Sequence, residues 1–187
     1  MFASDDPRWA PVLGIDPGLT RCGYAVLRRF PDGAKITAEA EVLSMGVLRT
    51  EPREPLANRL ASIHLDVEAL LREFRPGAVA VEQVFFQNNV RTAMSVAQVS
   101  GVVLSLAVRA NCQVVQYTPS QVKNAIAGWG GADKEQVQKM VKLRLGLATL
   151  PRPADAADAA ALALCHLAMS ASMAGANSRI SQSLAAQ

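Results

Sequence analysis

The chain has 187 residues, half of them hydrophobic, and it carries a formal net charge of +3 with an isoelectric point near 9.0. This composition excludes a disordered chain and fits one globular domain with a sizeable core. The mild positive charge is compatible with a polyanionic partner but is weak evidence for one.

Cysteine and histidine usage argues against a zinc or disulfide framework. The three cysteines are well separated and only two histidines are present, so we expect reduced, buried thiols in a cytoplasmic protein. The apolar runs are too short to span a membrane. We expect a flexible extension at residues 1–11, one domain at 12–170 and a flexible tail at 171–187.

The first part of the chain predicts three consecutive strands. An apolar run at residues 12–16 stops at a Pro-Gly turn, a second run follows at 22–30, and an alternating segment covers 38–48. These three segments form a meander.

Helices and strands alternate after the meander. Apolar residues at helical spacing predict a helix over 54–74, and a buried strand follows at 78–83. A helix rich in small residues covers 88–110 and precedes a strand at 112–117.

Three more helices complete the prediction. Thr118 as N-cap and Pro119 at the first helical position start one, and Asp133 caps another. An alanine-rich helix follows Pro153. The order predicts an α/β protein with a five-stranded mixed sheet and helices on both faces, which is typical of the ribonuclease H-like fold.

Four carboxylates stand out in this order. Asp16 and Glu82 each end an apolar strand, and Asp155 and Asp158 begin the last helix. Sites gather at the carboxyl ends of parallel strands. We therefore expect the four acids to share one pocket, with divalent cations compensating their charge.

Three of the four acids also have a simpler explanation. Asp155 and Asp158 can cap their helix, where an acid in the first turn contributes about 0.3–1 kcal/mol. Asp16 can be a turn residue before Pro-Gly, whereas Glu82 has no turn to explain it. Two like charges three residues apart repel, however, so a pair makes more sense around a cation.

The all-oxygen donor set suits Mg²⁺ or Mn²⁺. Two such ions would activate a water for in-line attack at phosphorus, with no covalent intermediate on the protein.

Basic and aromatic residues nearby are candidates for binding DNA. Lys123 and Lys134 can contact phosphate or can be solvated helix lysines. Phe85, and less so Phe86, can stack on unpaired bases or can belong to the core. The polar candidates for backbone phosphates are Asn88, Asn89 and Arg91.

Four segments together resemble a known family. "GIDPGLTRCGYAV", "AVEQVFFQNNVRTA", "TPSQVKNAIAGWGGADKEQVQKMV" and "DAADAAALALCH" are similar, in this order, to motifs of the RuvC-type Holliday junction resolvases. The likeness runs from about residue 12 to 168 and is specific because all four blocks occur.

The resemblance implies a metal-dependent endonuclease. Family members are bacterial cytoplasmic homodimers that nick two opposing strands of a four-way DNA junction, and a branch-migration helicase is a further partner that the resemblance suggests. The four acids match the family's metal ligands, Lys123 and Lys134 match its basic residues, and Phe85 matches its stacking aromatic. Some members have histidine where Asp155 stands.

Two other classes compete with this interpretation. The "GIDPGLTRCGYAV" hairpin is also similar to the phosphate-binding hairpin of actin-like and sugar-kinase ATPases, but those proteins need a second such hairpin, which we do not find. A module that binds branched DNA without cutting it gains nothing from four acids facing phosphates. ATP turnover without DNA would favour the first class, and binding without nicking would favour the second.

Overall fold

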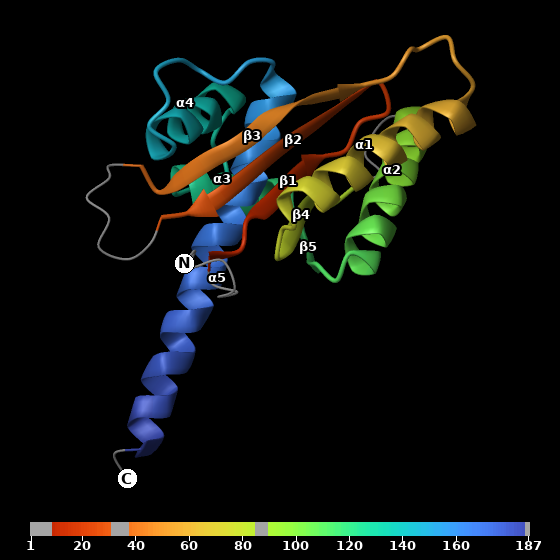
Figure 1. The fold of residues 1–187 in the computed structure, drawn as a ribbon. Coiled ribbons are helices and arrows are strands. Elements are labelled where there is room, and N and C mark those ends of the chain that lie inside the picture. Colours follow the sequence, from red (N-terminus) through yellow and green to blue (C-terminus); the bar gives the residue numbers. More distant parts are fainter. Residues whose placement is uncertain (1–8, 31–37, 85–89, 186–187) are drawn as a thin grey trace.

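The structure is a computed structural model that describes residues 9–30, 38–84 and 90–185, without the side chains of 90–92 and 171–185 (Figure 1). The strands are β1 (Val12–Asp16), β2 (Arg21–Arg29), β3 (Ala40–Arg49), β4 (Ala78–Glu82) and β5 (Gln113–Tyr117). The helices are α1 (Leu56–Phe74), α2 (Val90–Arg109), α3 (Pro119–Ala127), α4 (Lys134–Arg144) and α5 (Ala154–Ala185). The predicted order of elements is confirmed, with ends that differ by a few residues.

The five strands form one mixed sheet in the order β3-β2-β1-β4-β5. β1, β2 and β3 are antiparallel neighbours, and this arrangement confirms the predicted meander. β4 pairs with β1 in parallel, and β5 pairs with β4 in parallel. The parallel half of the sheet places the ends of β1, β4 and β5 at the same edge.

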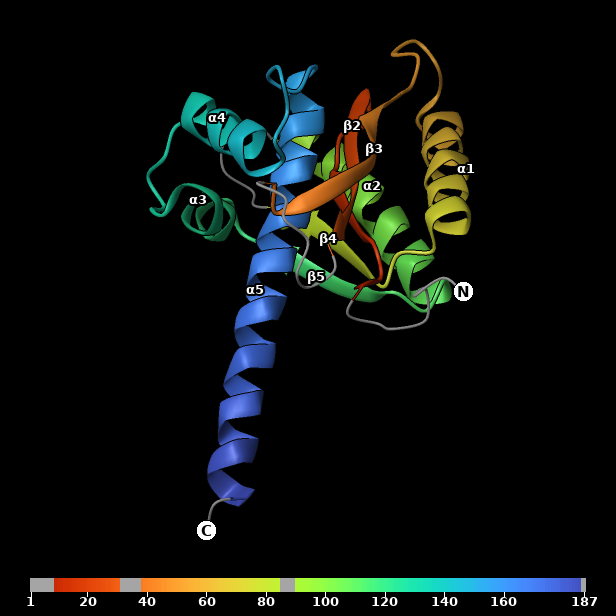
Figure 2. The same cartoon turned by 60° about the vertical axis from the view of Figure 1, so that its left-hand side comes forward.

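Helices cover both faces of the sheet, as predicted (Figures 1 and 2). Side chains on a strand alternate between the two faces. Leu13 and Ile15 therefore join the core under α1 and α2. Val12 and Ala80 join the other core, under α3, α4 and α5.

Helix α5 lies unusually close to β1 and β2 because the facing residues are glycine. A Cβ atom at Gly14 would stand 2.1 Å from the carbonyl oxygen of Ala159. One at Gly23 would stand 2.0 Å from the carbonyl oxygen of Asp155. The alanine-rich composition of α5 has the same cause, since only small side chains fit between the helix and the sheet.

The predicted starts of α3 and α4 are confirmed. The Thr118 hydroxyl accepts a hydrogen bond from the backbone N–H of Gln121 at 3.1 Å. The Asp133 carboxylate accepts one from Gln136 at 2.8 Å. In both helices the glutamine side chain also accepts from the backbone N–H of the capping residue, which completes a capping box. These caps fix the two helices that carry Lys123 and Lys134.

The last helix is longer than the sequence predicted. A flexible tail was expected from residue 171, but α5 continues as a helix through Ala185 and projects away from the sheet (Figure 2). The physical reason is that no proline follows Pro153, and the segment contains many good helix formers. None of the helices in the described ranges is long and apolar enough to cross a membrane.

The predicted N-terminal extension is only partly described, because residues 1–8 lie outside the described ranges. Pro11 accepts a hydrogen bond from the backbone N–H of Gly77 at 2.9 Å. The described end of the extension is therefore tied to the start of β4.

Candidate active site

Two of the four acids end neighbouring parallel strands. The register pairs Ile15 of β1 with Val81 of β4, so Asp16 and Glu82 follow at adjacent positions. Both strands are buried up to this point, and both acids are partly buried. The sheet thus presents two carboxylates side by side at its carboxyl edge.

The first turns of α5 bring the other two acids to this edge. Gly23 is the β2 partner of Asp16, and the backbone of Asp155 rests directly on Gly23. Asp158 lies one turn further along the same helix. The close contact of α5 with Gly14 and Gly23 brings Asp155 and Asp158 to Asp16, which lies more than a hundred positions earlier in the chain.

The four carboxylates interact electrostatically. The pKa of Asp16 is raised from 3.8 to about 7, first by burial and then by the charges of Glu82, Asp158 and Asp155, while the charge of Lys134 acts in the opposite direction. Burial and the charge of Asp158 also raise the pKa of Glu82. A carboxyl whose pKa lies near neutrality is a functional-site candidate, because burying such a group is costly.

Two cations partly compensate these charges. Lys134 donates from Nζ to the Oδ2 atom of Asp158 at 2.6 Å. This hydrogen bond raises the pKa of Lys134. Arg21, at the start of β2, donates to Oδ2 of Asp155 from Nε at 2.9 Å and from Nη2 at 2.6 Å. Sequence reasoning missed Arg21, because its partner is distant in the chain and an arginine at a strand end is ordinary.

The donor set fits a hard divalent cation, although the acids do not surround a common point. In the described part of the chain, no three His, Cys, Asp or Glu side chains are grouped closely enough to hold a metal ion. Instead, Asp155 contacts the side chain of Arg21 and Asp158 contacts that of Lys134, each through Oδ2. Carboxylate oxygens with no soft ligand suit Mg²⁺ or Mn²⁺, so the chemistry of the residues agrees with such an ion.

A small pocket opens beside the acids. Its volume is about 220 Å³, and its polar lining comes from Glu82, Lys123, Lys134 and Asp158. Its apolar wall comes from residues of α3, α4 and α5. The structure therefore brings both predicted lysines to the same place as two of the predicted acids.

Several predicted DNA contacts lie outside the described residues. These are Phe85, Phe86, Asn88 and Asn89. The backbone of Arg91 belongs to the first turn of α2, but its side chain is not described. All of them remain predictions. Their segment leaves β4 soon after Glu82 and is therefore attached to the site by the backbone.

His166 packs rather than joining the acids. Its Nδ1 lies 2.9 Å from the Tyr117 hydroxyl, and both residues are buried between β5 and α5. Burial lowers the pKa of His166, which disfavours its charged form. His166 therefore contributes to the core between β5 and α5.

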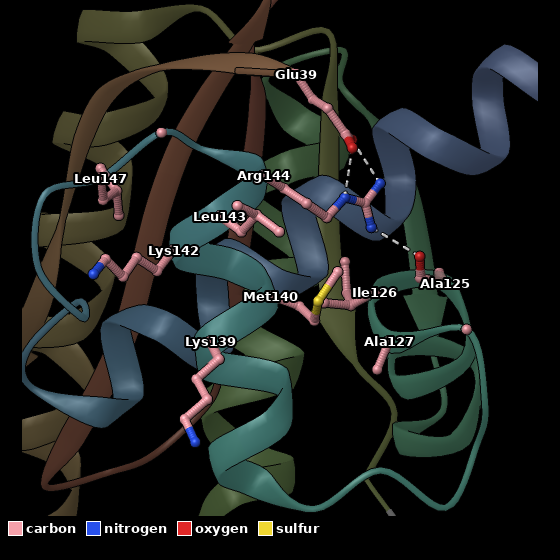
Figure 3. Close-up of a pocket in the computed structure, with 12 residues that line it drawn as sticks. Glu39, Ala125, Ile126, Ala127, Lys139, Met140, Lys142, Leu143, Arg144 and Leu147 are labelled. Atoms are coloured by element: carbon pink, nitrogen blue, oxygen red, sulfur yellow. Dashed lines mark hydrogen bonds and ion pairs between the residues drawn. The ribbon is translucent and has the colours of Figure 1, made fainter. Parts of the chain in front are cut away.

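A second pocket, over α3 and α4, has a volume of about 1050 Å³ (Figure 3). Arg144 donates to both carboxylate oxygens of Glu39, at 2.9 and 2.6 Å, and to the backbone oxygen of Ala125 at 2.8 Å. These bonds tie α3 and α4 to the chain just before β3. Among the described residues that line this pocket, Glu39 is the one acid, and it is engaged with Arg144.

Comparison with protein families gives one match over most of the chain. Residues 12–166 match the family model described as crossover junction endodeoxyribonuclease RuvC. A protein of this name from Frankia alni is 53% identical over 156 residues, which are 83% of this chain and 77% of that protein.

Solved structures agree with this match. The structure of Thermus thermophilus RuvC has a TM-score of 0.78 and 43% identity, and the match covers 86% of this chain and 95% of that one. The same T. thermophilus protein in complex with a Holliday junction substrate gives the same TM-score and identity over 86% and 94% of the two chains.

Proposed function

The chain belongs to the family of the crossover junction endodeoxyribonuclease RuvC, and from this premise we propose that Asp16, Glu82, Asp155 and Asp158 form its metal-binding and DNA-cleaving site. The protein is an endodeoxyribonuclease that resolves Holliday junctions, and it acts in DNA recombination and repair. Nucleases of this family depend on divalent metal. The finer assignments are supported by the geometry of the four acids.

The observation that carries the assignment is the burial of Asp16 among other carboxylates. A lone buried charge costs several kcal/mol, and a protein keeps such a group where a cation compensates it. Asp16 has three acidic neighbours that each raise its pKa. We propose Mg²⁺ or Mn²⁺, two ions to a site, held by these four residues.

When bound, such ions polarise a phosphoryl oxygen, activate a water as nucleophile and neutralise the leaving oxygen. The chain's own residues provide the frame for this chemistry. Asp16 and Glu82 are fixed by the parallel pairing of β1 and β4, and Asp155 and Asp158 by the packing of α5 on glycine. The frame therefore holds the backbones of the four acids near one another before DNA arrives, which lowers the entropic cost of reaction.

Lys134 and Lys123 are proposed to act on the DNA phosphates. Lys134 already lies within hydrogen-bond distance of a site acid, and its raised pKa keeps it charged. It can stabilise negative charge that develops on the scissile phosphate. Lys123 lines the same pocket and can hold a flanking phosphate.

The segment after Glu82 is proposed to contact opened bases at the crossover. Phe85, with Phe86 beside it, would stack on unpaired bases, worth about 1–3 kcal/mol per base. Asn88 and Arg91 would contact backbone phosphates. Support comes from the direct attachment of this segment to β4, which ends in Glu82.

Resolution by two symmetric cuts favours a homodimer, because one site cuts one strand and a twofold axis supplies the second. The exposed stripe of α2 supports a contact between copies. Its members are Met94, Gln98, Gly101, Ser105 and Val108, spaced so that they share one helix face. Met94 and Val108 are 55% and 64% exposed, and a Cβ atom at Gly101 would meet nothing within 4 Å.

We further propose that the dimer works in the bacterial cytoplasm and cooperates with a branch-migration helicase. Support for the bacterial setting comes from the bacterial sources of its relatives. A pull-down of the full chain with the helicase components of such a bacterium tests this partner.

The test of the site is a nicking assay on a synthetic four-way junction beside a linear duplex, with Mg²⁺ and Mn²⁺ in parallel. Asp16→Asn, Glu82→Gln and Asp158→Asn should each lower nicking to background while junction binding persists, because each removes a metal ligand. Lys134→Ala should slow nicking. Phe85→Ala should impair nicking more than it lowers the melting temperature.

Glu68→Gln is the matched control, because Glu68 is an exposed acid on α1, across the sheet from α5. It should nick as the wild type does. Wild-type nicking by one of the three acid variants removes that residue from the site. Junction binding without any nicking by the wild type in either metal would favour a binding module.

A further inference from the structure

We propose that Arg21 is a built-in counter-cation that competes with divalent metal for the site, and so weakens metal binding as long as its contact with Asp155 is intact. This inference rests on the proposed function, in which the four acids bind metal. The guanidinium of Arg21 contacts Asp155, which is one of those acids.

The contact is specific in its geometry. Nε and Nη2 of Arg21 both donate to Oδ2 of Asp155, at 2.9 and 2.6 Å. Residues alternate along β2, so Arg21 lies on the same face as Gly23, the residue on which α5 rests. The guanidinium therefore reaches the first turn of α5 from the sheet face on which α5 rests.

The hairpin that precedes Arg21 is held in place by its own hydrogen bonds. Arg59 of α1 donates to the hydroxyl of Thr20 at 2.6 Å and to that of Thr50 at 2.9 Å. The Thr50 hydroxyl donates to the carbonyl of Leu19 at 2.5 Å. The backbone that carries Arg21 is thus held in place, and the contact of Arg21 with Asp155 does not depend on a loose loop.

Competition follows from where the positive charges sit. Asp155 pairs with Arg21 and Asp158 pairs with Lys134, and no described group of three acids is arranged to hold a metal. A divalent ion at these acids must displace the guanidinium or tolerate it nearby. Both outcomes oppose metal binding, because like charges repel.

Removing Arg21 should leave Asp155 in place. The backbone of Asp155 is fixed against Gly23, so the carboxylate stays near Asp16 without its partner. Removing Arg21 therefore changes the orientation of the Asp155 carboxylate little. Its main effect is to remove a positive charge that repels the metal ion. In a nearly aqueous dielectric, a unit charge several ångströms from a divalent ion changes its affinity by about tenfold at most.

The test is calorimetric titration of Mn²⁺ into the metal-free, DNA-free full chain. Arg21→Gln should tighten binding by about three- to tenfold. Arg21→Met serves as a second charge-removing variant and should behave alike, and melting in EDTA checks that each variant folds. Arg21→Lys keeps the charge and should stay within about twofold of the wild type.

Arg28→Gln is the matched control. Arg28 lies on the same strand, is 46% exposed against 42% for Arg21, and pairs with Glu41 at 2.7 Å. Its removal should leave Mn²⁺ affinity unchanged. Unchanged or weaker binding by Arg21→Gln and Arg21→Met would overturn the proposal.

Failure of the proposed function would look different. In that case either the wild type would show no saturable Mn²⁺ binding, or Asp16→Asn would bind Mn²⁺ as the wild type does. If the wild type binds and Asp16→Asn does not, the acids bind metal, and the Arg21 variants alone decide this inference.

Discussion

At the scale of single residues, Asp16 gives the metal-free protein a pH dependence of known sign. Burial, together with the charges of the neighbouring acids, raises its pKa from 3.8 to about 7 in the folded state, whereas the unfolded chain releases this proton near the ordinary value. Between these two pH values the unfolded state binds fewer protons. The free energy of unfolding should therefore fall as pH rises from about 4 to about 7.

Asp16→Asn removes this titration, because asparagine has a similar shape and no charge. In EDTA, the free energy of unfolding of the wild type should fall, relative to that of Asp16→Asn, by on the order of a few kcal/mol between about pH 5 and about pH 8. Denaturant unfolding at both pH values measures the difference. Identical pH dependence in the two proteins would show that Asp16 is not buried among charges as described.

Residue-scale reasoning from sequence reached the four acids and Lys134, but not Arg21. Asp16 and Glu82 end apolar runs, where a charge is conspicuous in one dimension. Arg21 pairs with a residue 134 positions away, and only the packing of α5 on Gly23 reveals that contact. A pairing that depends on backbone proximity leaves no local pattern in a sequence.

At the scale of elements, the glycines beneath α5 determine whether the site assembles. Gly23→Ala would place a Cβ atom 2.0 Å from a backbone oxygen of α5, and neither backbone can yield locally. We expect the helix to shift, nicking to be lost and the free energy of unfolding to fall by about 1–3 kcal/mol or more. Nicking assays and denaturant unfolding measure the two effects.

Gly46→Ala on β3 separates this effect from the general cost of a strand substitution. There the new Cβ atom meets the ring of Tyr24 at 3.0 Å, a side chain that can move aside. Its effect on stability and nicking should be clearly smaller. If the two variants behave alike, the close approach of α5 does not control the site.

Elements with local signals were predictable, and those governed by distant packing were less so. The Thr118 and Asp133 caps were visible because capping is a property of neighbouring residues. The far part of α5 was not expected to be helical, since its small polar residues resemble a linker although most of them tolerate a helix. The contact of α5 with glycine was not visible in the sequence at all.

At the scale of the whole molecule, the proposed dimer would use a surface that the sequence shows only as a helix rich in small residues. Val108 belongs to the exposed stripe of α2 and is 64% exposed. If this stripe joins two copies, Val108→Glu places two buried charges at the interface, and burying unpaired charge is costly. We expect this variant to sediment as a monomer, whereas the wild type sediments as a dimer.

Loss of the dimer should change the products as well as the mass. A monomer carries one set of acids, so junctions should accumulate with a single nick instead of being resolved into two duplexes. Leu143→Glu is the control, because Leu143 is 69% exposed on α4, across the sheet from α2. It should remain dimeric and cut in pairs. A dimeric Val108→Glu that still resolves junctions would place the twofold contact elsewhere on the molecule.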